Sequence, residues 1–136
     1  MSFRMKVAVP TWQGRVSPVF DVARRLLVVE YQDGAERARS ETAITGTTPA
    51  DRAKDVSRLG VDVLVCGAIS RPLERLLVAE GVEVIPQTCG DVNEVLAAFQ
   101  AGQLNRPAFV MPGCGRRRQM RWRQGCRRLE AHWRGL

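Results

Sequence analysis

The sequence predicts an α/β fold in which a β-sheet lies between two layers of helices. Along its 136 residues, short apolar runs and segments with helical spacing follow one another in the order β-β-β-α-β-α-β-α. Two strand–helix–strand crossovers in the second half require parallel neighbours with helices packed on the sheet. In the first half, Asp33-Gly34 separates two strand-like runs and marks a hairpin. Together these observations predict a three-layer α/β sandwich.

The first three strands are expected before any helix. The run Met-Lys-Val-Ala-Val is predicted to stop at Pro10, and the following loop contains Gly14 and Pro18. The third run is polar and is therefore predicted to lie at a sheet edge. These three strands are expected at residues 5–9, 26–31 and 35–43.

Start and stop signals predict three helices. Thr48 is expected to cap the first, and Gly60 to end it. Ser70 is expected to cap the second, which ends at Gly81. Asp91-x-x-Glu94 has the form of a capping box for the third. The strands between these helices are expected at residues 61–66 and 82–85.

The composition narrows the range of functions. The hydrophobic content of 45% suits a globular chain, and no apolar run approaches the length of about 20 residues that spans a bilayer. The N-terminus lacks the pattern of a signal peptide, so a cytoplasmic location is expected. His132 is the only histidine, and the sequence contains neither a G-x-G-x-x-G motif nor a Walker loop. These absences predict a protein that is not an enzyme.

The excess positive charge lies in a C-terminal tail. Residues 1–115 carry equal numbers of basic and acidic residues, whereas residues 116–136 carry eight arginines and one acid. The expected organisation is a domain over 1–115 and a basic tail over 116–136. An apolar stripe at helical spacing runs through the tail at Trp122, Cys126, Leu129, Trp133 and Leu136.

Two interpretations of the tail remain open. The stripe could dock on the domain or on a second subunit. Alternatively, its arginines could contact an acidic protein, an anionic cluster, a nucleic acid or a membrane surface. The candidate contact residues are Arg116, Arg117, Arg118, Arg121, Arg123, Arg127 and Arg128.

Candidate ligand-binding residues follow three of the predicted strands. In an open α/β sheet, ligands bind beyond the carboxyl ends of the parallel strands. Glycine at such an end lets a ligand approach the backbone closely. The candidates at these ends are Thr11, Trp12 and Gln13, then Cys66 with Gly67, and Cys89 with Gly90.

Each candidate also has a structural interpretation. Cys66 ends an apolar strand and could pack as a small hydrophobe. Cys89 precedes a predicted helix start, where the positive end of the helix dipole favours a thiolate, but it could equally be a loop residue with no part in binding a ligand. Gly67 and Gly90 could serve only their turns. Cys114 lies in a Pro-Gly-Cys-Gly stretch and could be an exposed thiol or a ligand.

Five segments, in order, resemble the dinitrogenase iron–molybdenum cofactor biosynthesis domain, which includes carrier proteins of the NifX and NifB type. The segments begin with Lys-Val-Ala-Val-Pro at residue 6 and together span most of residues 5–115. The other four are residues 17–24, 65–70, 89–95 and 111–114. Where many carriers in the family have His-Phe-Gly, this chain has Val19-Phe20-Asp21, so that histidine is absent.

The resemblance implies a ribonuclease-H-like fold with a mixed five-stranded sheet in the order 3-2-1-4-5. It also implies non-catalytic binding or carriage of an iron–sulfur or molybdenum–iron cluster, with cofactor-assembly or acceptor proteins as partners. Soft thiolates suit such clusters. We therefore expect Cys89 and Cys114 as principal ligands, Cys66 as a secondary ligand, and residues 11–13 as the lining of the pocket. Binding of nucleic acid or of an acidic partner through the tail is the alternative.

Overall fold

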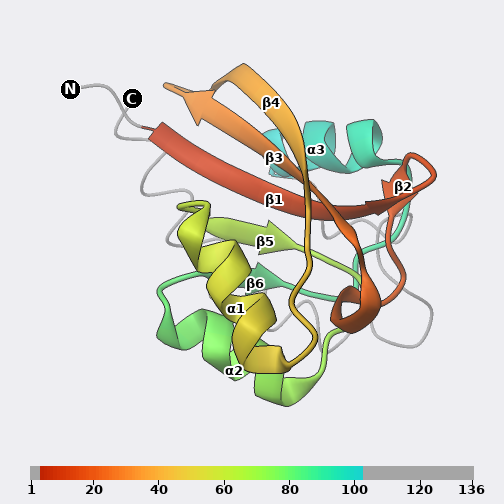
Figure 1. The fold of residues 1–136 in the computed structure, drawn as a ribbon. Coiled ribbons are helices and arrows are strands. Elements are labelled where there is room, and N and C mark those ends of the chain that lie inside the picture. Colours follow the sequence, from red (N-terminus) through yellow and green to blue (C-terminus); the bar gives the residue numbers. More distant parts are fainter. Residues whose placement is uncertain (1–3, 103–136) are drawn as a thin grey trace.

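A computed structural model of the chain describes residues 4–102, which fold into a sheet covered by helices on both faces (Figure 1). The predicted strands and helices are all present, with boundaries that shift by a few residues. Two short elements, β2 and the 3-10 helix η1, were not predicted. The elements are β1 (Arg4–Trp12), β2 (Arg15–Val16), η1 (Phe20–Val22), β3 (Arg25–Gln32), β4 (Ala35–Ala43), α1 (Pro49–Arg58), β5 (Val63–Val65), α2 (Arg71–Ala79), β6 (Glu83–Ile85) and α3 (Val92–Gln100).

The sheet has an antiparallel half and a parallel half. Its strand order is β4-β3-β1-β5-β6, and β2 pairs with the end of β1. Strand β1 is antiparallel to β3 and parallel to β5, which is in turn parallel to β6. The carboxyl ends of β1, β5 and β6 therefore meet at one edge of the sheet, which positions the loops that follow them.

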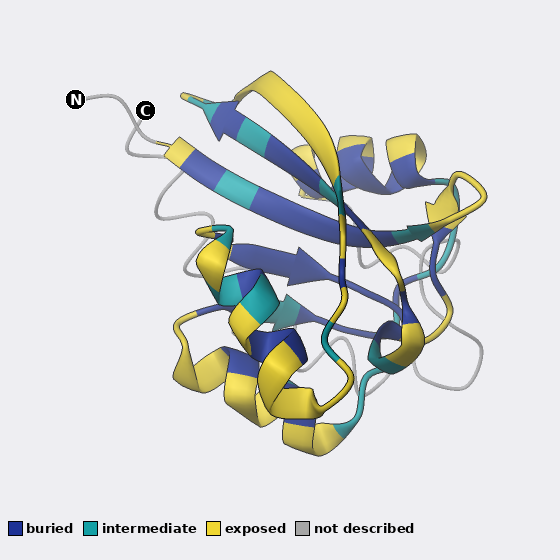
Figure 2. Cartoon of the chain, viewed as in Figure 1, coloured by how far each residue is buried: buried dark blue, intermediate teal, exposed yellow. Residues whose placement is uncertain are grey.

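Apolar side chains fill both sides of the sheet. Helix α3 packs on one face, whereas α1 and α2 cover the other (Figure 1). The central strand β1 is buried along most of its length, and the helices expose only their outer sides (Figure 2). Among residues 4–102, no helix combines the length and the apolar character that crossing a membrane requires.

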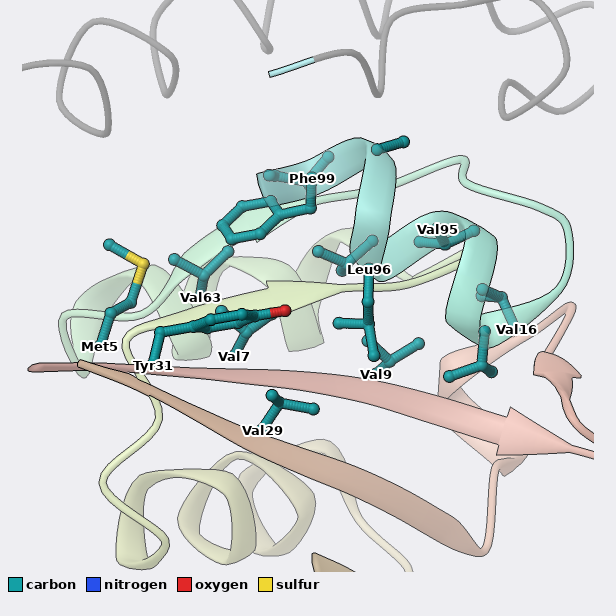
Figure 3. Packing of buried hydrophobic residues seen from close by; sticks show 14 residues of the cluster. Met5, Val7, Val9, Val16, Val29, Tyr31, Val63, Val95, Leu96 and Phe99 are labelled. Carbon is teal, nitrogen blue, oxygen red and sulfur yellow. The ribbon is translucent and has the colours of Figure 1, made fainter. Parts of the chain in front are cut away.

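The α3 side of the core surrounds Tyr31, the only tyrosine of the chain. Its ring lies between β1 and α3, with its centroid 6.4 Å from that of Phe99 (Figure 3). The Tyr31 side chain is buried, and this burial, followed by the nearby Glu36 carboxylate, raises the pKa of its hydroxyl to about 12. Tyr31 thus stays protonated at the pH values in which proteins normally function.

Two of the three predicted helix caps are confirmed. The Thr48 hydroxyl accepts a hydrogen bond from the Asp51 amide at 3.1 Å. The Asp91 carboxylate accepts from the amides of Asn93 and Glu94 at 2.9 and 3.2 Å. Ser70 occupies the N-cap position of α2, but its side chain makes no capping hydrogen bond, so this part of the prediction was wrong.

Pro10 does not end the first strand, contrary to prediction. It pairs with Leu26, and β1 continues to Trp12. The Pro10 carbonyl accepts from the Ser17 amide at 2.8 Å. In a β-strand, the nitrogen and the carbonyl oxygen of one residue point to the same side, so the Pro10 nitrogen also faces away from β3. Pro10 lies beyond the two residues of β1 that pair with β5, so its nitrogen is not needed for that pairing either. No hydrogen bond to β3 is lost, which is why the strand tolerates proline here.

Candidate functional site

The loops after β5 and β6 are joined at the carboxyl edge of the sheet. The Thr88 amide donates to the Cys66 carbonyl, and the Gln87 amide donates to the Gly67 carbonyl, each at 2.9 Å. Gln87 has a positive φ of 61°, a conformation that is uncommon for residues other than glycine. At the edge of the sheet where the sequence predicts a candidate site, the two loops are therefore joined by backbone hydrogen bonds.

The end of β1 forms a small hairpin against these joined loops. Trp12 pairs with Arg15 across a turn in which Gln13 and Gly14 have φ values of 53° and 77°. Two successive residues in the left-handed region are the signature of a tight type I′ turn. The Val16 amide donates to the Gly90 carbonyl at 2.9 Å, which ties the hairpin to the loop after β6.

Residues 17–20 cross the loop after β5. Val19 forms an isolated parallel bridge with Ala68, and the Ala68 amide donates to the Pro18 carbonyl at 2.8 Å. Gly67 makes this approach possible, because a Cβ atom there would lie 2.5 Å from the Pro18 oxygen and 2.6 Å from the Ser17 oxygen. The space at Gly67 is therefore occupied by the chain itself.

Residues 17–20 continue into η1, and a buried arginine of α1 holds this segment in place through hydrogen bonds. Arg52 is 5% exposed, and its guanidinium donates to the backbone carbonyls of Phe20, Ala23 and Gly46. Its Cζ atom lies 5.3 Å from the centroid of the Phe20 ring. Burial lowers the pKa of the Arg52 guanidinium, whereas the carboxylates of Asp21 and Asp55 act in the opposite direction.

A pocket of about 820 Å³ opens between the hairpin, the segment through η1, and the adjoining ends of β3 and β4. Its wall is partly apolar: Trp12, Val19 and Val22 are 60%, 39% and 72% exposed, although large apolar side chains usually avoid water. The residues that line it are Thr11, Trp12, Gln13, Gly14, Ser17, Pro18, Val19, Val22, Ala23, Arg24, Arg25 and Glu41.

Charged groups lie at the β3–β4 side of the pocket. The Arg25 guanidinium is 3.7 Å from the Glu41 carboxylate, and the Thr11 hydroxyl is 3.5 Å from the same carboxylate oxygen. Both side chains of the ion pair are exposed, so the pair itself stabilises the fold by less than about 1 kcal/mol. Arg24 is also exposed and lines the pocket. A ligand with negative charge could therefore reach two guanidinium groups.

The structure separates the predicted site residues into two groups. Thr11, Trp12 and Gln13 line the pocket, whereas Gly67 is buried behind its wall and Gly90 holds the hairpin through its carbonyl. Cys66 is fully buried in the apolar layer between the sheet and helices α1 and α2, and Cys89 is partly exposed in the loop after β6.

The remaining predictions fall elsewhere. Cys114, the seven candidate contact arginines of the tail and the apolar stripe lie outside the described residues. Between residues 4 and 102, no group of three or more His, Cys, Asp or Glu side chains is arranged to hold a metal ion.

Sequence reasoning missed the part of the pocket that the antiparallel strands contribute. Arg25 and Glu41 come together because β3 and β4 pair with Arg25 opposite Ala43, and Arg24 immediately precedes β3. A partial signal was available, since Arg24 ends a segment that resembles the family. Arg52 was also missed, although it precedes the buried Val56 by four residues and so shares its helix face.

Comparisons with solved structures show the same fold. The crystal structure of the protein PH0822 superposes with a TM-score of 0.71 at 19% identity, covering 82% of this chain and 99% of the other. The apo form of the orange protein from Desulfovibrio gigas gives a TM-score of 0.61 at 21% identity, with coverage of 80% and 93%. The protein MJ0327 from Methanocaldococcus jannaschii gives 0.60 at 21%, with coverage of 74% and 92%.

No protein of curated function matches the sequence significantly. A family model does match, and its description is dinitrogenase iron–molybdenum cofactor. The match extends over residues 4–102, which are the residues that form the sheet, its helices and the pocket. The chain therefore belongs to the dinitrogenase iron–molybdenum cofactor family.

Proposed function

We propose that the protein binds an iron–sulfur or molybdenum–iron cluster as cargo during metallocofactor assembly, without catalysing a reaction. The observation that carries this proposal is the family match, which covers the whole described domain including the pocket. The proteins that make or accept the cluster are then its partners. Within this proposal we also assign the three-layer fold to the ribonuclease-H-like group.

The pocket is the proposed cargo site because of its position and its chemistry. It lies at the carboxyl end of β1, where open α/β sheets bind ligands. Its apolar wall around Trp12 and Val22 would exclude water from one side of a cluster. Arg24 and Arg25 would supply positive charge and hydrogen bonds to cluster sulfurs, which are interactions that tune such clusters in proteins.

Thiolates remain part of the proposal. Cys89 is partly exposed and immediately precedes Gly90, whose carbonyl accepts from the hairpin beside the pocket. We propose Cys89 as a ligand together with Cys114. Complete burial of Cys66 supports packing rather than ligation for this residue, so we give it no more than a secondary role.

Anaerobic reconstitution tests the proposal. The full chain is incubated with ferrous iron and sulfide, with and without molybdate, desalted, and examined for a thiolate-to-iron absorption band and for bound metal. We expect a band that weakens in Cys89→Ala and persists in Cys66→Ala. A colourless wild-type protein without bound metal would contradict cluster binding. A band of full intensity in Cys89→Ala would contradict only the thiolate assignment.

A further inference from the structure

Arg52 is buried and contacts the backbone of other segments, which its position near the start of α1 does not explain. An arginine near the start of a helix normally extends into water, because burying a charge without compensation is costly. Here the whole residue is 5% exposed, and its guanidinium points at backbone oxygens from two other segments. Its Nε atom has no hydrogen-bond partner among residues 4–102, so part of the cost of burial remains uncompensated.

Two of the three carbonyls that Arg52 contacts belong to one short turn. Its Nη2 atom donates to the carbonyls of Phe20 and Ala23, the former at 2.6 Å. Phe20 begins η1, and Ala23 immediately follows it. Since η1 is only three residues long, its own hydrogen bonding is limited to the Ala23 amide donating to the Phe20 carbonyl at 3.1 Å. The guanidinium therefore supplies contacts that a three-residue helix cannot make for itself.

This turn is part of the pocket wall. Val22 and Ala23 line the pocket on one side of the backbone, while Arg52 contacts the Phe20 and Ala23 carbonyls from α1. The Phe20 ring is buried below the same guanidinium. A planar guanidinium fixes several acceptors in one geometry, whereas an ammonium group acts as a point charge. The position of Val22 and Ala23 thus depends on a residue that does not itself line the pocket.

We infer that Arg52 is a positioning residue: its guanidinium fixes residues 20–23 in the conformation with which the pocket receives cargo. This inference rests on the proposed function of the pocket. It assigns Arg52 no contact with the cargo, and it distinguishes Arg52 from Arg24 and Arg25, which line the pocket directly.

Amide hydrogen exchange of the cargo-free full chain tests the first half of the inference. The Phe20 amide, which donates to Ala68, and the Ala23 amide report on the wall. The Asp62 and Val95 amides, hydrogen-bonded in other parts of the domain, report on the rest of the fold. In Arg52→Met we expect the wall amides to exchange faster, relative to these references, by about tenfold or more for each charge-assisted hydrogen bond lost.

Arg52→Lys keeps the charge but not the planar group. If Arg52→Met does not fold, this second variant shows whether the guanidinium fixes the pocket wall. It should retain protection of Asp62 and Val95 while still loosening Phe20 and Ala23. Lys54→Met, an exposed cation on the same helix, is the control and should change neither set. An equal acceleration at all four amides in Arg52→Lys would show a purely structural role and overturn the inference.

Loading with ferrous iron and sulfide tests the second half. We expect Arg52→Lys to bind the resulting cluster about tenfold more weakly than the wild type, in line with the loss of a preorganised wall. Unchanged affinity despite a loosened wall would overturn the positioning role. If the wild type itself binds no cluster, the proposed function fails, whereas the exchange data still decide whether Arg52 fixes the wall.

Discussion

A Cβ atom on Gly67 would lie 2.5 Å from the carbonyl oxygen of Pro18, closer than folded proteins allow. Gly67→Ala should therefore push residues 17 and 18 away from the loop after β5. We expect a loss of about 3 kcal/mol in the free energy of unfolding, because backbone rather than a flexible side chain must move. Chemical denaturation measures this loss.

Gly14→Ala provides the control for that measurement. Gly14 has a positive φ of 77°, but a Cβ atom there would meet no other atom within 4 Å, so only backbone strain of about 1 kcal/mol opposes alanine. Equal losses in the two variants would show that the crossing of residues 17–18 over Gly67 is not as close as described.

The two N-caps of α2 and α3 should respond differently to alanine. Asp91→Ala removes a carboxylate that accepts from two backbone amides, and it should lower the free energy of unfolding by about 1 kcal/mol. The Ser70 hydroxyl makes no capping bond and is buried without a hydrogen-bond partner among residues 4–102. Ser70→Ala should consequently be neutral or slightly stabilising in the same denaturation experiment. A larger loss at Ser70 than at Asp91 would contradict this account.

Tyr31 should make the protein less stable at high pH. The pKa of its hydroxyl rises from 10.0 to about 12 on folding, so the unfolded chain gives up this proton at lower pH than the folded chain does. The resulting stability is fully present below pH 10 and is lost between pH 10 and about 12, amounting to about 2–3 kcal/mol. Tyr31→Phe should lack this part of the pH dependence. Because the chain has a single tyrosine, its tyrosinate absorbance reports the titration directly, and an ordinary pKa would refute the prediction.

Glu41 should oppose the binding of anionic cargo. Its carboxylate lies 3.7 Å from the Arg25 guanidinium on the pocket wall, so it competes for that cation. Glu41→Gln should tighten cluster binding by up to about fivefold, the range expected for an exposed ion pair. Titration of the full chain with iron and sulfide measures the change. Glu36→Gln is the control, since Glu36 pairs with Arg39 on the same strand; an equal effect in both variants would exclude a specific role for Glu41.

Local signals in the sequence were sufficient to predict most elements, whereas contacts between distant segments determined what was missed. Short apolar runs and the Asp33-Gly34 turn predicted the presence of the strands. Pro10 was misjudged because its effect depends on which side of the strand its nitrogen faces, which only the position of Ser17 reveals. The sequence led to the edge at which the pocket opens through Trp12, which lines it, but the cationic side of the pocket depends on the pairing of β3 with β4.

The burial of Cys66 illustrates the same limit. A cysteine at the end of an apolar strand could face a ligand or the core, and the pattern of residues does not distinguish these outcomes. Packing of α1 and α2 against the sheet places it in the core. Arg52 is the opposite case, because the sequence does show something unusual there: a charged residue on an apolar helix face. The contacts of its guanidinium with η1 explain why the charge lies on that face.

Metal analysis of the wild type and of Trp12→Ala, each reconstituted without oxygen and desalted, shows whether the pocket holds the cluster. Trp12 lines the pocket and is 60% exposed, so its removal should cost little stability but open one wall of the cargo site. The control is Val78→Ala, which removes an apolar side chain that is 58% exposed on α2. We expect bound iron in the wild type and in Val78→Ala, and at least a severalfold loss in Trp12→Ala. Equal iron in all three proteins, or none in the wild type, would contradict this expectation.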